Sequence, residues 1–150
     1  MPAPLLLGTI ELARLLEATE ASVSHRAVDL FRAARPDLAP TAIAVAGGHA
    51  FFYGARSPLS QAIGIGMNGA VSEDEFRRLE DFFLSRGAPI ILSLCPLADA
   101  SVLLCIGRSS YRISHFEHTL VRTVEDIQRS DVFRVRRVLP EEDSIGPLPY

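Results

Sequence analysis

Residues 61–95 read QAIGIGMNGAVSEDEFRRLEDFFLSRGAPIILSLC and contain three consecutive secondary-structure signals. Gln61–Met67 alternates small or polar residues with aliphatic ones, which predicts a strand. Ser72 begins a Ser-x-x-Glu capping box, and the apolar residues after it recur at helical spacing up to Gly87. Pro89–Cys95 is an aliphatic run, which predicts a strand buried on both faces. A strand, a helix and a strand in this order predict one parallel crossover.

The N-terminal third predicts a long helical region. Apolar residues recur at helical spacing from Ile10 to Ala34, so we expect one long helix or two consecutive ones. Thr9 precedes the first turn as an N-cap. Pro36 ends the region, because the residue before a proline avoids helical angles.

A β-hairpin is expected next. Thr41–Ala46 and His49–Tyr53 are β-prone runs separated by Gly47-Gly48, a pair that can take both positive φ angles of a type I′ turn. The three consecutive aromatic residues at the end of the second run can be buried or can form a packing surface for another module. Burial is the expectation that we adopt.

The C-terminal part predicts a short helix at Ala100–Ser109 and strands at Phe116–Arg122 and Val132–Val138. The resulting fold class is α/β (α+β), a mostly antiparallel central sheet flanked by helices. Residues 1–140 are expected to form a single domain. Residues 141–150 are expected to be a tail or the start of a linker.

Composition limits the classes of function. With 150 residues and 48% hydrophobic content, the chain can bury a core without disulfides or metals. No apolar run approaches the roughly 20 residues of a membrane span, and no secretory signal is recognisable, so we expect a cytoplasmic protein without a membrane partner. Net charge is −3, and the arginines are scattered over the sequence. Nucleic acid is therefore not an expected partner.

The cysteines and histidines favour structural roles. Cys95 and Cys105 lie in apolar surroundings, which is typical of reduced core residues. Cys95 with His115 or His118 is a conceivable thiolate and base pair, but a cysteine buried in a strand is usually inert. His115 and His118 are three apart in an expected strand and so face opposite sides, and we expect no metal site. Two further histidines are expected at solvated positions, namely His25 and His49.

Five acidic residues gather on the predicted central helix, Glu73, Asp74, Glu75, Glu80 and Asp81. They are a candidate site for a metal or a basic substrate. A capped helix start followed by a solvated face interleaved with arginines is the interpretation that we prefer.

Several short segments carry a family resemblance. They are Gly47-Gly48, Ser57-Pro58-Leu59, Arg86-Gly87-Ala88-Pro89, Leu94–Asp99, Tyr111-Arg112-Ile113 and Phe116–Arg122. With the order of elements, they resemble the GCN5-related N-acetyltransferase (GNAT) family over about Leu12 to Arg122. The match is to the N-terminal GNAT-like module of bacterial proteins that carry two such modules in tandem. The resemblance implies a GNAT fold and a partner, either a second GNAT module or a second copy of this chain.

Gln61–Gly66 matches the Gln/Arg-x-x-Gly-x-Gly/Ala signature with which this family holds the pyrophosphate of acetyl-CoA. In the family that loop follows a strand and opens a helix, whereas here the motif is expected inside the strand. The loop position is held by Asn68–Glu75, and its three carboxylates repel a pyrophosphate. We therefore expect no cofactor.

The family's general acid is a tyrosine in a Tyr-x-x-x-Gly-Phe/Tyr pattern. If Tyr111 is the terminal aromatic, Ile106 takes the place of the acid and Ser110 that of the glycine. Isoleucine cannot donate a proton. Catalytic and cofactor-binding residues are therefore left unassigned.

Three functions remain open. The first is a non-catalytic GNAT-like domain that pairs with a second GNAT module or dimerises. An alternative is an active acetyltransferase that moves an acetyl group from acetyl-CoA to an amine, with Gln61, Gly64 and Gly66 at the cofactor. A second alternative is a small-molecule binding module.

Overall fold

The computed structural model describes residues 8–121, of which residues 8–117 belong to one compact unit. Its elements are α1 (Ile10–Ala34), a short 3-10 helix (Pro36–Leu38), β1 (Thr41–Val45), β2 (Gly48–Phe52), β3 (Gln61–Ile63), α2 (Glu73–Leu84), β4 (Leu92–Ser93) and α3 (Ser101–Gly107). The strands form one sheet in the order β1-β2-β3-β4, with the first two pairs antiparallel and β3–β4 parallel. The expected mixed α/β domain with a mostly antiparallel sheet and one parallel crossover is confirmed.

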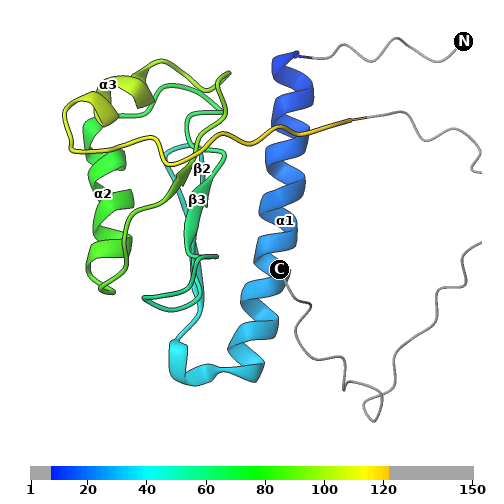
Figure 1. Ribbon diagram of the computed structural model, residues 1–150, viewed down its shortest axis with the longest axis vertical. Helices are drawn as coiled ribbons and strands as arrows, with labels where there is room; N and C mark the ends of the chain where they lie inside the picture. Colours follow the sequence, from blue (N-terminus) through cyan, green and yellow to red (C-terminus); the bar gives the residue numbers. More distant parts are fainter. Residues whose placement is uncertain (1–7, 122–150) are drawn as a thin grey trace, which may run out of the picture. The chain divides into compact units, whose positions relative to one another are not determined.

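Two apolar layers hold the sheet. Helix α1 lies along one face, where its Ala21 and Val28 pack against Phe51, Tyr53 and Ile63 (Figure 1). Helices α2 and α3 cover the opposite face and enclose the larger core with the alternate residues of the strands. Side chains of consecutive strand residues point to opposite faces, so the aromatic run from Phe51 serves both layers. All three aromatic residues of that run are buried, as expected.

Helix α1 is one continuous helix of 25 residues. Its start was predicted correctly, because Thr9 Oγ1 accepts a hydrogen bond from the Leu12 amide at 3.3 Å. Its end was also predicted correctly, since the last helical residue is Ala34, two residues before Pro36.

The hairpin is confirmed, but its turn lies one residue earlier than predicted. Ala46 and Gly47 take the positive φ angles, 52° and 74°, while Gly48 pairs with Val45 inside the ladder. Gly48 is needed there for another reason. A β-carbon on it would lie 2.4 Å from the Ile63 carbonyl oxygen, so the backbones of β2 and of the end of β3 approach more closely than any side chain allows.

The predicted strand Gln61–Met67 is wrong beyond Ile63. Gly64 and Gly66 follow with φ of 72° and 73°, a left-handed conformation that turns the chain out of the strand. The Gly66 amide donates a hydrogen bond to the Ala46 carbonyl at 2.9 Å, which fastens this loop to the hairpin turn.

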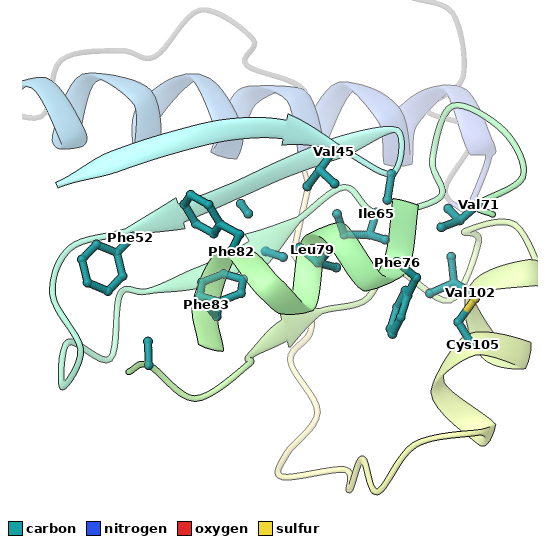
Figure 2. Close-up of a cluster of buried hydrophobic side chains, with 14 residues drawn as sticks. Val45, Phe52, Ile65, Val71, Phe76, Leu79, Phe82, Phe83, Val102 and Cys105 are labelled. Atoms are coloured by element: carbon teal, nitrogen blue, oxygen red, sulfur yellow. The ribbon is translucent and has the colours of Figure 1, made fainter. Parts of the chain in front are cut away.

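Helix α2 begins and ends as its sequence predicts. Both halves of the capping box are formed, between Ser72 and Glu75. At the other end, the Ala88 amide donates to the Phe83 carbonyl around Gly87, which has a φ of 67°. This is a Schellman ending with glycine in the left-handed position. The buried face of α2 forms the centre of the larger core, where Phe76 lies near Val71, Val102 and Cys105 (Figure 2).

The predicted strand Pro89–Cys95 is mostly wrong. Only the two residues of β4 pair with β3, and Ile91 keeps 36% of its surface exposed. The predicted strand Phe116–Arg122 is also wrong over 116–121, which contain no regular structure and are exposed or half-buried. Within residues 8–121, β4 is the last strand of the sheet, and both of its residues are half-buried rather than buried. Val132–Val138 and the boundary at residue 140 lie outside the described residues.

Among residues 8–121, no helix is long and apolar enough to cross a membrane.

Candidate functional site

The glycine motif lies at the end of β3, where it joins three parts of the fold. Gln61 is a sheet residue, whereas Gly64 and Gly66 belong to the loop that follows. The Gly66 amide bonds Ala46, and its carbonyl accepts from the Asp99 amide at 2.9 Å. Both polar backbone groups of Gly66 are therefore used within the protein. The amide is not free to bind an anion.

The start of α2 holds three carboxylates. The Ser72 amide and hydroxyl bond the Glu75 carboxylate, at 3.1 and 2.9 Å, and these bonds hold the pKa of Glu75 below its usual range. The other two acids have arginine partners, in the exposed pairs Asp74–Arg77 and Glu73–Arg108. This is the capped and solvated helix start that we preferred for these residues.

Ile106 packs against the larger core. The Tyr111 hydroxyl donates to Glu80 Oε1 at 3.0 Å, and its ring meets the Phe76 ring edge-on at 5.9 Å. Burial, and then the hydrogen bond to Glu80, raise the pKa of Tyr111. The phenol therefore holds its proton firmly. Glu80, Ile90 and residues 109–114, which include Tyr111, line a wide open hollow of about 700 Å³.

The cysteines and the C-terminal histidines do not form a reactive cluster. Both cysteines are free; Cys105 is buried, which raises the pKa of its thiol, and Cys95 is half-buried. The His115 ring nitrogens are engaged by Ser114 Oγ at 2.9 Å and Glu117 Oε1 at 3.0 Å. Over residues 8–121, no group of three or more His, Cys, Asp or Glu side chains is arranged to hold a metal ion.

A second, smaller cavity of about 200 Å³ lies between α1 and the loops at the end of the hairpin. Side chains of Arg14 and Glu17 reach it from α1, His49 from β2, and Asn68 from the loop after β3. Its remaining lining is Ala18, Ala21, Gly47, Gly48, Ile63, Gly64 and Met67. Because three of these are glycines, main chain rather than side chains forms much of the wall.

Glu17 is the most unusual group in this cavity. Its Oε2 is buried and has no hydrogen-bond partner among residues 8–121. Burial, and then the charge of Glu20, raise the pKa of Glu17, while the nearby Gly64 amide partly offsets both effects. A perturbed carboxylate that faces a cavity is typical of functional sites.

His49 and His25 are linked across the α1–sheet interface. His25 Nε2 lies 3.2 Å from His49 Nδ1, and both rings contact the buried Phe51 ring. Burial and then His25 lower the pKa of His49. The prediction that His49 is solvated is wrong, because the helix covers the end of β2. His25 is exposed, as expected.

Two of the residues in the cavity were missed from the sequence, Arg14 and Glu17. A signal was present, since Glu17 lies about one helical turn before Ala21, two before His25 and three before Val28, all on the face of α1 that meets the sheet. No protein family, curated protein or solved structure matches this chain. The candidate site therefore rests on geometry and electrostatics.

Proposed function

We propose that this chain is a GNAT-like domain without catalytic activity that acts by pairing with another such module. For this chain by itself, the pairing is a homodimer. The order of elements supports the assignment, because a hairpin, a third strand, a capped helix, a parallel strand and a short helix follow each other as the resemblance implies. The proposed pairing rests on strand β4, which is short and has no strand on its outer side within residues 8–121.

β4 is a short strand at the edge of the sheet. It pairs with β3 over two residues, and within residues 8–121 no strand covers its other side. Ile91 is partly exposed beside it, and farther along the chain Ile113 and Phe116 expose 78% and 82% of their surfaces. Unpaired backbone groups at a sheet edge are a template for another strand, and exposed apolar side chains gain free energy when a partner covers them. A second copy provides both a strand edge and an apolar surface.

Three features support the absence of acetyltransferase chemistry. The Gly66 amide is bonded within the fold, and the start of α2 carries three carboxylates. The position of the expected general acid is held by Ile106, which packs on the core. A pyrophosphate would meet an acidic helix start, and a leaving thiolate would find no proton donor at that position.

Sedimentation velocity of the purified chain over a range of concentrations tests the pairing. We expect a dimer at about 100 μM, as for any dissociation constant in the low micromolar range. Ile91→Lys places a charge beside β4 and should shift the protein to monomer. Leu30→Lys makes the same exchange at an exposed site on α1, across the sheet, and should leave the dimer intact. A wild-type monomer at that concentration, or equal effects of both variants, would contradict the proposal.

A further inference from the structure

The cavity beside α1 contains two opposite charges that do not meet. Arg14 and Glu17 are three residues apart on one helix, a spacing at which such side chains commonly form an ion pair. No ion pair joins them in the part of the chain that the structure describes. Both nevertheless line the same cavity.

A main-chain contact explains why Arg14 stays apart from Glu17. Arg14 Nε donates to the Met67 carbonyl at 2.8 Å, which holds the guanidinium against the loop after β3. Neither Nη atom of Arg14 has a hydrogen-bond partner within residues 8–121. The Gly64 amide lies close enough to lower the pKa of Glu17, but no donor within residues 8–121 meets hydrogen-bond geometry with the buried Glu17 Oε2. A buried acceptor without a donor costs roughly 1–3 kcal/mol or more, so a ligand that supplies one binds favourably.

The other polar groups define what the cavity can accept. The Asn68 amide nitrogen already donates to the Gly47 carbonyl at 2.8 Å, which leaves its oxygen as an acceptor. His49 Nδ1 is engaged with His25. The cavity thus offers a carboxylate and an amide oxygen to a hydrogen-bond donor, and a guanidinium to an anion.

We propose that this cavity binds a small zwitterion of amino-acid size. Its ammonium group donates to Glu17 Oε2, and its carboxylate accepts from the Nη atoms of Arg14. At about 200 Å³, the cavity is smaller than the pockets of roughly 300–1,000 Å³ that hold drug-sized ligands. Glycines in the cavity wall leave room for a ligand. A β-carbon on Gly64, for example, would lie 3.9 Å from Glu17 Oε2 and would occupy the space next to that atom. The site is independent of the proposed pairing, which uses β4.

Heteronuclear NMR titration of the full chain with glycine, L-alanine and L-serine tests the site. We expect saturable shifts of the Gly47, Gly48, Gly64 and Asn68 amides, with a dissociation constant of about 1 mM or lower for at least one of the three. Ethylammonium chloride and sodium acetate, which each carry one of the two charges, should bind at least tenfold more weakly. No saturation by any amino acid at about 10 mM would overturn the proposal, as would equal binding of either single-charge probe.

Charge variants test the assigned roles. Glu17→Gln and Arg14→Gln should each weaken binding of the amino acid at least tenfold. Glu11→Gln and Arg26→Gln remove the same charges from exposed positions of α1 outside the cavity and should change affinity by less than about twofold. Retained affinity in both cavity variants would also overturn the proposal. The amide spectrum of each variant reports directly whether it is folded.

Discussion

Gly66 lies directly against Val102, so closely that a β-carbon on Gly66 would be 2.4 Å from Val102 Cγ2. Val102 is fully buried and anchors α3 to the larger core (Figure 2). Because Gly66 also bonds Ala46 and Asp99, a single residue joins the hairpin turn, the loop after β3 and the segment that opens α3. Gly66, the second glycine of the apparent cofactor motif, is therefore required by packing.

Replacement of Gly66 by alanine should destabilise the fold strongly. The new methyl group overlaps Val102 and must also adopt a φ of 73°. Overpacking of this kind and a left-handed alanine together cost about 3 kcal/mol. Urea unfolding followed by far-UV circular dichroism measures the loss.

Gly87→Ala is the matched control for this substitution. Gly87 has a similar φ of 67°, but a β-carbon there would meet nothing within 4 Å. Only the conformational cost remains, about 1 kcal/mol. If the two variants lose equal stability, the close contact with Val102 contributes nothing.

The features that the sequence predicted correctly depend on near neighbours in the chain. The Thr9 cap, the stop at Pro36 and the capping box at Ser72 each involve residues within four positions of each other. The position of the hairpin turn depends instead on Gly48 and the Ile63 carbonyl, which meet only in the folded sheet. The end of β3 likewise depends on Gly64 and Gly66. Glycine is compatible with either a strand or a turn, and in the folded protein the position of α3 decides between them. Local patterns cannot carry that information.

The candidate site also depends on contacts between distant parts of the sequence. Gln61 and Gly66 stand out in the sequence because a short pattern of glycines is easy to match by chance. The cavity instead combines Glu17 on a helix with His49 on a strand, residues 32 positions apart in the sequence. Their meeting requires α1 to lie across the sheet, and only polar residues among the apolar ones on the sheet-facing side of the helix indicate it in advance.

The capping box of α2 should contribute measurably to stability. Ser72→Ala removes the hydroxyl that accepts from the Glu75 amide at 3.2 Å, which costs about 1 kcal/mol. Ser85→Ala, at the other end of α2, removes a hydroxyl that, among the described residues, accepts a single exposed hydrogen bond, from Arg86, and should cost less than about 0.5 kcal/mol. Urea unfolding midpoints compare the two variants. A loss from Ser72→Ala no larger than that from Ser85→Ala would show that the capping box does not stabilise the fold.

Acetyl-CoA should not bind this chain. Isothermal titration calorimetry with acetyl-CoA should give no saturation at about 100 μM, because the Gly66 amide is occupied and the start of α2 is acidic. Glu73→Gln tests the electrostatic part of this explanation and should not restore binding by itself. Saturable binding by the wild-type chain would contradict a non-catalytic role and favour the acetyltransferase alternative.

Stability should depend on pH through His49. Burial and His25 lower its pKa from the ordinary value of 6.5, so the unfolded chain binds more protons than the folded one near that pH. The contribution of His49 is therefore fully present above pH 6.5 and is lost as the pH falls through 6.5 towards the lower folded value. Glu17, across the same cavity, acts in the opposite direction. Its pKa is raised from 4.5, so its contribution is present below that pH and is lost as the pH rises through the folded value.

Variants separate these opposing effects. We expect the stability of the wild type relative to His49→Gln to increase as the pH rises from about 5 to 7.5, and its stability relative to Glu17→Gln to decrease as the pH rises above about 4.5. Urea unfolding at a series of pH values measures both differences. His115→Gln is the control, because His115 is exposed and, within residues 8–121, bonds only the nearby Ser114 and Glu117. If His49→Gln shows the same pH profile as the control, burial of His49 beneath α1 does not lower its pKa in solution.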